Sequence, residues 1–106
     1  MDKKRVLNIL SSFRRVLEER GLRIERLILF GSYALETNRE ESDIDVVVVS
    51  RDFAGKDYWE RVDILSRAIY EVFEPIEAIA FTPEEWEEET SSISAYAKNG
   101  EVVYGV

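Results

Sequence analysis

The sequence predicts an α+β (mixed α/β) fold, in which a small mixed β-sheet is backed by helices. Two segments place apolar residues at the three- and four-residue spacing of a helix. Between and after them lie short runs of β-branched and aromatic residues, which are typical of strands. The resulting order is helix, strand, short helix, strand, helix, strand, helices, strand. We expect one domain over residues 1–106, because a chain of this length leaves little room for a second core.

The first helix is expected over residues 3–20, with Gly21 at its C-terminal cap. Residues 24–30 follow as a strand that becomes fully apolar toward its end, as a strand covered on both faces does. Ser32 is then expected to cap a short helix that begins at Tyr33. The apolar stripe of the first helix consists of Val6, Leu7, Leu10, Phe13, Val16 and Leu17.

The strongest strand signal in the chain covers residues 43–49 and contains four consecutive valines. It follows a polar loop over 37–42, and we expect it to lie centrally in the sheet. A loop over 51–57 leads to a second amphipathic helix over 58–73, which Pro75 ends. The apolar positions of that helix are Val62, Leu65, Ile69, Val72 and Phe73.

The C-terminal third predicts a strand, two helical segments and a last strand. The strand covers 76–81, and Thr82 is expected as the N-cap of the helix that follows, with proline at its first position. The sequence over 84–89 indicates a charged helical surface that Trp86 anchors inward. Residues 93–98 continue helically until a glycine, and 101–105 form a short edge strand.

The composition excludes several kinds of site. The chain has no cysteine and no histidine, so disulfide scaffolds, thiol nucleophiles, histidine-based triads and Cys/His zinc sites are excluded. Carboxylates, hydroxyls and lysines remain as catalytic groups. No segment approaches the roughly 20 apolar residues of a membrane helix, and the N-terminus is too charged for a signal peptide. We therefore expect a cytoplasmic protein without a membrane partner.

Charge is distributed unevenly along the chain. The formal net charge is −8, yet residues 1–30 hold eight Lys/Arg against four Asp/Glu, while residues 31–106 hold six against eighteen. This balance argues against general nucleic-acid binding, which requires excess positive charge. The acidic part suits divalent cations or a basic partner surface, and a solubilising surface is the simpler interpretation of most of these charges.

Two aspartates lie at the beginning of the valine-rich strand. Asp43 and Asp45 are two residues apart, so in an extended strand they point to the same face. Like charges so close repel each other unless a cation lies between them, and Mg²⁺ accepts oxygen ligands alone. The alternative is that Asp43 caps a loop and Asp45 lies on a solvent-exposed face of the sheet.

A Gly-Ser pair lies earlier in the chain, directly after the first strand. Gly31 allows a phosphate to approach the backbone, and Ser32 adds a hydroxyl donor at the beginning of the expected helix. The alternative is an ordinary turn with a helix cap.

Together these segments give Gly-Ser, ten residues, then Asp-x-Asp. This pattern resembles the signature of the DNA polymerase beta-like nucleotidyltransferases, and most closely that of the minimal nucleotidyltransferase (MNT) family. The resemblance extends over nearly the whole chain, since members of that family are small and often end in a helix and short strand similar to residues 97–104. A separate acceptor-binding domain is not seen in this sequence.

The resemblance implies magnesium-dependent transfer of a nucleoside monophosphate from a nucleoside triphosphate, with ATP favoured as donor, to an acceptor hydroxyl, releasing pyrophosphate. By the same resemblance, Asp43 and Asp45 hold two metal ions, and Gly31 and Ser32 hold the terminal phosphates. Glu77 is the candidate third catalytic and metal-binding carboxylate, expected to help deprotonate the acceptor. Many relatives have aspartate there, and a surface glutamate is the alternative.

The resemblance also implies a partner, because minimal nucleotidyltransferases commonly pair with a small all-helical protein of the HEPN class. In such toxin–antitoxin pairs the HEPN protein is a ribonuclease toxin, which the antitoxin neutralises, in some cases by adenylylating it. One alternative is a binding module that neutralises its partner by occlusion, with weak or lost catalysis. A stand-alone enzyme acting on a small hydroxylated molecule is a further alternative.

Four further residues are weaker candidates for nucleotide contacts. Arg39 and Arg51 flank the Asp-x-Asp strand and are candidates for phosphate binding, although loop arginines are more often solvated. Tyr33 and Trp59 are candidates for base stacking, although packing in the core or at its rim is the simpler interpretation.

Overall fold

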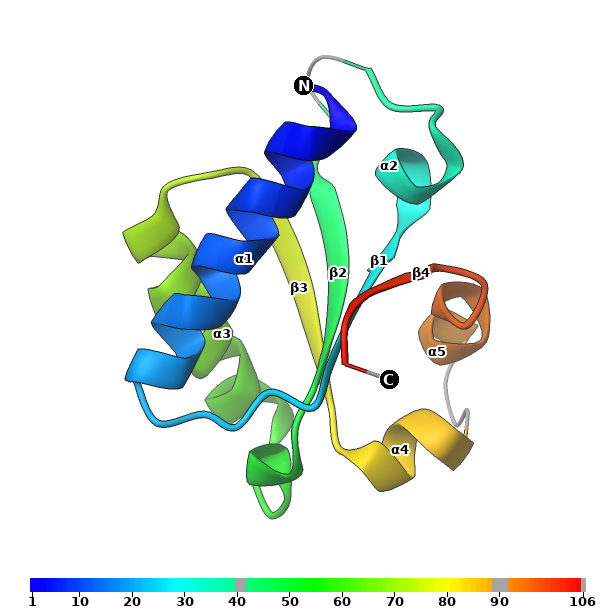
Figure 1. Ribbon diagram of the computed structural model, residues 1–106. Coiled ribbons are helices and arrows are strands. Elements are labelled where there is room, and N and C mark those ends of the chain that lie inside the picture. Colours follow the sequence, from blue (N-terminus) through cyan, green and yellow to red (C-terminus); the bar gives the residue numbers. More distant parts are fainter. Residues whose placement is uncertain (40–41, 89–91, 106) are drawn as a thin grey trace.

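The computed structural model describes residues 1–39, 42–88 and 92–105 and shows a four-stranded mixed sheet with helices on both faces (Figure 1). The predicted fold class is therefore confirmed. The elements are α1 (Lys3–Glu19), β1 (Arg26–Phe30), α2 (Gly31–Leu35), β2 (Ile44–Val49), a 3-10 turn (Arg51–Phe53), α3 (Tyr58–Val72), β3 (Ile76–Phe81), α4 (Pro83–Glu88), α5 (Ser92–Ala97) and β4 (Glu101–Tyr104).

The strand order is β3-β2-β1-β4, so β2 lies inside the sheet and β4 at an edge, as predicted. β1 pairs antiparallel with both β2 and β4, whereas β2 and β3 are parallel. In this register Asp45 of β2 is paired with Phe30 of β1 on one side and with Glu77 of β3 on the other. The end of β1 and two of the predicted carboxylates thus form one row across the sheet.

Each face of the sheet has its own apolar cluster. Val46 and Val48 of β2 pack with α1 and α3, while Val47 and Val49 pack with Trp86 of α4 on the opposite face. Figure 1 shows α1 and α3 together against the strands, with α4 and α5 following β3 at the other side of the molecule. Because successive strand residues alternate between faces, a run of four valines suits a strand that is buried on both sides.

The apolar face of α1 differs by one position from the prediction. Leu7 is 37% exposed, whereas Ile9 is buried. Ile9 lies three residues after Val6 and four before Phe13, so helical periodicity places it on the same face as these buried residues. The helix ends as expected, with Gly21 in a left-handed conformation at φ +95°.

Two expected positions in other helices were wrong. Ser32 does not cap α2, which begins at Gly31 and has Phe30 at its N-cap without a side-chain hydrogen bond. Phe73 does not belong to the buried face of α3, because it lies at the C-terminal cap in a left-handed conformation and is 81% exposed. The C-terminal expectations hold better: the Thr82 hydroxyl accepts a hydrogen bond from the Glu85 amide at the beginning of α4. In the described part of the chain, none of the helices is long and apolar enough to cross a membrane.

Candidate active site

Three acidic residues lie where β2 and β3 begin. Asp43 immediately precedes β2, Asp45 lies within it, and Glu77 is the register partner of Asp45 on β3. Register partners on parallel strands point to the same face, which here is the face opposite α1 and α3, because Val46 and Ala78 pack on the α1 side. Asp45 is half-buried, while Asp43 and Glu77 are exposed. The structure therefore places Asp45 and Glu77 side by side on one face of the sheet, with Asp43 two residues before Asp45.

The electrostatics of Asp45 reflect this arrangement. Its pKa is raised to about 6, first by burial and then by the charges of Glu77 and Asp43. In the described part of the chain, no basic side chain is paired with this partly buried carboxylate. A cation bound at this position would supply that charge.

Gly31 makes the close approach of β1 and the Asp45 carboxylate possible. It has φ +72°, and a Cβ added to it would collide with Oδ2 of Asp45 and lie 3.1 Å from its Cγ. Phe30 pairs with Asp45 on the neighbouring strand, and Gly31 follows Phe30 directly, so Gly31 lies next to the Asp45 carboxylate. A side chain at position 31 would occupy the space that the carboxylate needs. Ser32, the next residue of α2, is half-buried.

The carboxylates do not form a ready-made metal cage. Among residues 1–39, 42–88 and 92–105, no three acidic side chains are grouped closely enough to hold one ion. Mg²⁺, however, is commonly held by one or two carboxylates, with waters and substrate phosphates completing its shell. The oxygen-only donors and the raised pKa of Asp45 fit such an ion.

Three of the weaker candidates lie in an ion pair, in the core and on the surface of α3. Arg51 follows the far end of β2, where its side chain lies 3.5 Å from Glu25. Tyr33 is 2% exposed and packs in the core, as the simpler interpretation held. Trp59 is 73% exposed on α3, where its ring makes an edge-to-face contact with Tyr58, so it does not pack in the core.

Arg39 lies in the loop that leads to Asp43. Its backbone N–H donates a hydrogen bond to the Ser42 hydroxyl at 2.8 Å, and its side chain is exposed.

Trp86 is anchored inward as predicted, at 4% exposure. Glu89, the last residue of the expected acidic surface, lies outside the described residues.

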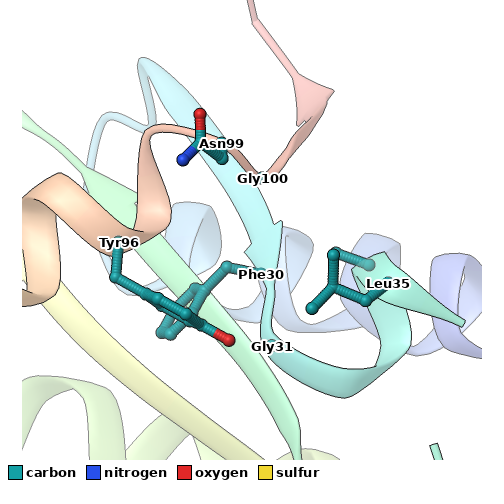
Figure 2. A pocket seen from close by; sticks show the side chains of 7 residues that line it. Phe30, Gly31, Leu35, Tyr96, Asn99 and Gly100 are labelled. Atoms are coloured by element: carbon teal, nitrogen blue, oxygen red, sulfur yellow. The ribbon is translucent and has the colours of Figure 1, made fainter. Parts of the chain in front are cut away.

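A cavity beside Gly31 was not predicted from the sequence (Figure 2). It has a volume of about 160 Å³ and joins the end of β1 to α2, α5 and the turn before β4. Its walls come from segments far apart in the chain, so no local motif marked it. The lining residues are Phe30, Gly31, Ala34, Leu35, Tyr96, Asn99 and Gly100.

Comparison with known proteins identifies the family. The family model described as a nucleotidyltransferase domain matches residues 10–96, which is most of the chain. The chain belongs to the nucleotidyltransferase domain family. This match confirms the resemblance drawn from the Gly-Ser and Asp-x-Asp motifs, which lie within the matched range.

Solved structures share the fold of this nucleotidyltransferase domain. A Sulfolobus solfataricus protein, described as a candidate nucleotidyltransferase, is 19% identical with a TM-score of 0.72, covering 92% of this chain and 78% of its own. A toxin–antitoxin complex with AMP-PNP is 18% identical with a TM-score of 0.63, covering 91% and 73%.

A variant of the toxin–antitoxin pair MntA–HpeT, in which two aspartates two residues apart are replaced by glutamate, is 16% identical with a TM-score of 0.62, again covering 91% and 73%. At these identities the likeness concerns the fold. No curated protein sequence matches the chain.

Proposed function

We propose that this protein is a magnesium-dependent nucleotidyltransferase that moves a nucleoside monophosphate, with AMP favoured, from a nucleoside triphosphate to an acceptor hydroxyl. The observation that carries the proposal is the meeting of Asp45 with Glu77 and Gly31 at one corner of the sheet. The family match supports the reaction class. The exposed positions of Asp43 and Glu77 leave the corner open to a ligand.

Each residue of the corner has a role that suits its chemistry. Asp43 and Asp45 would hold Mg²⁺, with two ions expected, and the bound cations supply positive charge to the phosphoryl oxygens and the leaving pyrophosphate. The Gly31 backbone N–H and the Ser32 hydroxyl would donate to the terminal phosphates.

In the transfer step the acceptor oxygen forms a bond to the α-phosphorus, and the bond from that phosphorus to pyrophosphate breaks. Glu77 would take the proton of the acceptor hydroxyl, directly or through water. Its exposure on the edge strand β3 allows an acceptor to reach it. The acceptor therefore approaches from the β3 side of the row.

The proposed acceptor is a hydroxyl on a small all-helical toxin of the HEPN type, for which this chain would be the antitoxin. Two of the structural neighbours are toxin–antitoxin complexes, one of them with AMP-PNP. The aspartates replaced in the other complex have the same two-residue spacing as Asp43 and Asp45. This agreement supports the partner and the importance of the acidic pair.

A second candidate function is neutralisation of the partner by occlusion without catalysis. It is favoured by Glu77, where the resemblance to minimal nucleotidyltransferases leads us to expect aspartate, and by the lack of a three-carboxylate metal cage in the described residues. The two functions differ in whether the wild type transfers a nucleoside monophosphate to its partner.

The metal and nucleotide test uses thermal unfolding of the purified protein. Mg²⁺ with ATP should raise the melting temperature of the wild type, because ligands that bind only the folded state stabilise it. Asp43→Asn combined with Asp45→Asn should remove this shift. Asp63→Asn, which changes an exposed carboxylate on α3, should preserve it. Equal shifts in all three proteins would contradict a metal site at the acidic pair.

A further inference from the structure

The cavity beside Gly31 adjoins the proposed phosphate site. Gly31 lines the cavity, and the position of its missing Cβ lies against the carboxylate of Asp45. A nucleotide with its terminal phosphates at Gly31 and Ser32 and its α-phosphate beside Asp45 therefore has this cavity within reach of its base. The cavity also lies at the β1 side of the Asp45 row, whereas Glu77 lies at the β3 side.

The walls of the cavity are mainly apolar and include an aromatic ring. Figure 2 shows Tyr96 and Leu35 on either side of the end of β1, near Gly31. Tyr96 makes an edge-to-face contact with Phe30, with ring centroids 5.9 Å apart. Tyr96 is still 54% exposed and Leu35 is 63% exposed, so both offer apolar surface to a flat ligand.

A polar side chain lies at the cavity as well. Asn99 belongs to the turn in which the Gly100 amide donates to the carbonyl oxygen of Ala97 at 2.8 Å. Gly100 allows this turn to lie against β1, because a Cβ there would collide with the carbonyl oxygen of Leu29. The Asn99 carboxamide has both donors and an acceptor, the combination that pairs with the N6 and N7 edge of adenine.

We propose that this cavity is the nucleobase site of the donor nucleotide, with the base stacked on Tyr96 and its edge facing Asn99. The inference rests on the proposed function, since it takes the phosphates to lie at Gly31 and Ser32. It adds the ligand class of the cavity, a purine base with adenine preferred. The base and the acceptor then occupy opposite sides of β2, and the α-phosphate lies between them.

The test is calorimetric titration with two probes in the presence of Mg²⁺. One probe is an ATP analogue with a non-cleavable α,β bridge, and the other is inorganic tripolyphosphate, which has no base. Tyr96→Ala should weaken binding of the analogue by roughly tenfold or more, because base–aromatic stacking is lost. Its affinity for tripolyphosphate should remain that of the wild type.

Two control variants isolate the stacking. Tyr96→Phe keeps the ring and should bind the analogue as the wild type does. Tyr70→Ala removes an exposed tyrosine on α3, outside the cavity, and should also bind normally. If Tyr96→Ala fails to fold in a melting experiment, Leu35→Ala at the opposite wall takes its place, with several-fold weaker binding expected for the analogue alone.

The outcomes separate the two proposals. Wild-type affinity of Tyr96→Ala for the analogue would overturn the base site while leaving the proposed function intact. An equal loss for both probes would also overturn it, because Tyr96 would then act on the phosphate site. If the wild type binds neither probe, the proposed function fails and the base site fails with it.

Discussion

At the scale of single residues, the position of the Asp45 carboxylate depends on the absence of a side chain at position 31. Gly31 combines a left-handed backbone with direct proximity to Asp45, so two separate penalties oppose any other residue there. The Asp45 carboxylate occupies the space in which a Cβ would lie. Loop conformation and carboxylate placement are thus linked through one glycine.

Gly31→Ala should lower the free energy of unfolding by about 1–3 kcal/mol through strain and collision. Gly55→Ala is a matched control, because Gly55 has φ +77° but no atom within 4 Å of an added Cβ. The control therefore measures backbone strain alone, and Gly31→Ala should cost more. Urea denaturation of both variants measures the difference. Equal losses would show that the Asp45 carboxylate moves away without cost.

The raised pKa of Asp45 predicts a pH dependence of stability when divalent metal is absent. In the folded state this pKa is about 6, above its ordinary value of 3.8, so the folded protein binds the proton more tightly. Stability should increase as pH falls through 6 and reach its full gain below 3.8. Asp45→Asn should flatten this dependence and raise the melting temperature at pH 7.

Thermal melts between pH 4 and pH 8 test this expectation. Asp52 and Glu85 act in the opposite sense at the acidic end, because Arg23 lowers the pKa of Asp52 to about 2 and Arg61 lowers the pKa of Glu85, so their contributions are lost as pH falls below about 5. The comparison with Asp45→Asn removes this common background. The same slope in the wild type and Asp45→Asn would place the titrating group elsewhere.

At the scale of elements, Arg61 joins α3 to two neighbouring segments. Its guanidinium donates to both carboxylate oxygens of Glu85 on α4, at 2.6 and 3.1 Å, and to the carbonyl oxygens of Phe53 and Lys56. Its side chain is only 16% exposed. Hydrogen bonds from a charged, largely buried donor contribute more to stability than exposed ion pairs do.

Arg61→Ala should therefore lower the free energy of unfolding by about 2–3 kcal/mol. Arg67→Ala removes an exposed pair with Asp63 on the same helix and should cost at most about 0.5 kcal/mol. Chemical denaturation of the two variants gives the comparison. Losses of similar size would mean that the Arg61 contacts are solvated and contribute little.

The elements differ in how far the sequence predicts them. The strand over 76–81 and the cap at Thr82 rest on local signals, namely β-branched residues and a Thr-Pro pair, and the structure confirms both. Ser32 was wrongly expected as a cap because glycine extended the helix by two residues toward the strand. Local chemistry thus predicts the existence of elements better than their first residues.

In the candidate site, too, local features could be predicted from the sequence and long-range ones could not. The Gly-Ser and Asp-x-Asp motifs are local and were visible in the sequence, whereas the pairing of Asp45 with Glu77 depends on the register of two parallel strands. No short turn sets that register, because parallel strands are joined by a long crossover. The cavity beside Gly31 depends on the pairing of the C-terminal strand β4 with β1, which no local pattern encodes.

At the scale of the whole molecule, the sheet places the two proposed substrates apart. The donor nucleotide would lie at the β1 side of β2 and the acceptor at the β3 side, so the acidic corner separates them. The net charge of −8 leaves most of the surface unsuited to a nucleic-acid acceptor and suited to a basic protein surface.

The most direct test is the intact mass of a HEPN-type helical partner after incubation with this protein, Mg²⁺ and ATP. The wild type should add one nucleoside monophosphate, and Glu77→Gln should slow the addition by roughly 10² or more while partner binding is retained. Glu77→Asp should keep measurable activity, because it preserves the carboxylate. A partner that is neutralised by the wild type yet remains unmodified at saturating Mg²⁺ and ATP would contradict nucleotidyl transfer and establish occlusion instead.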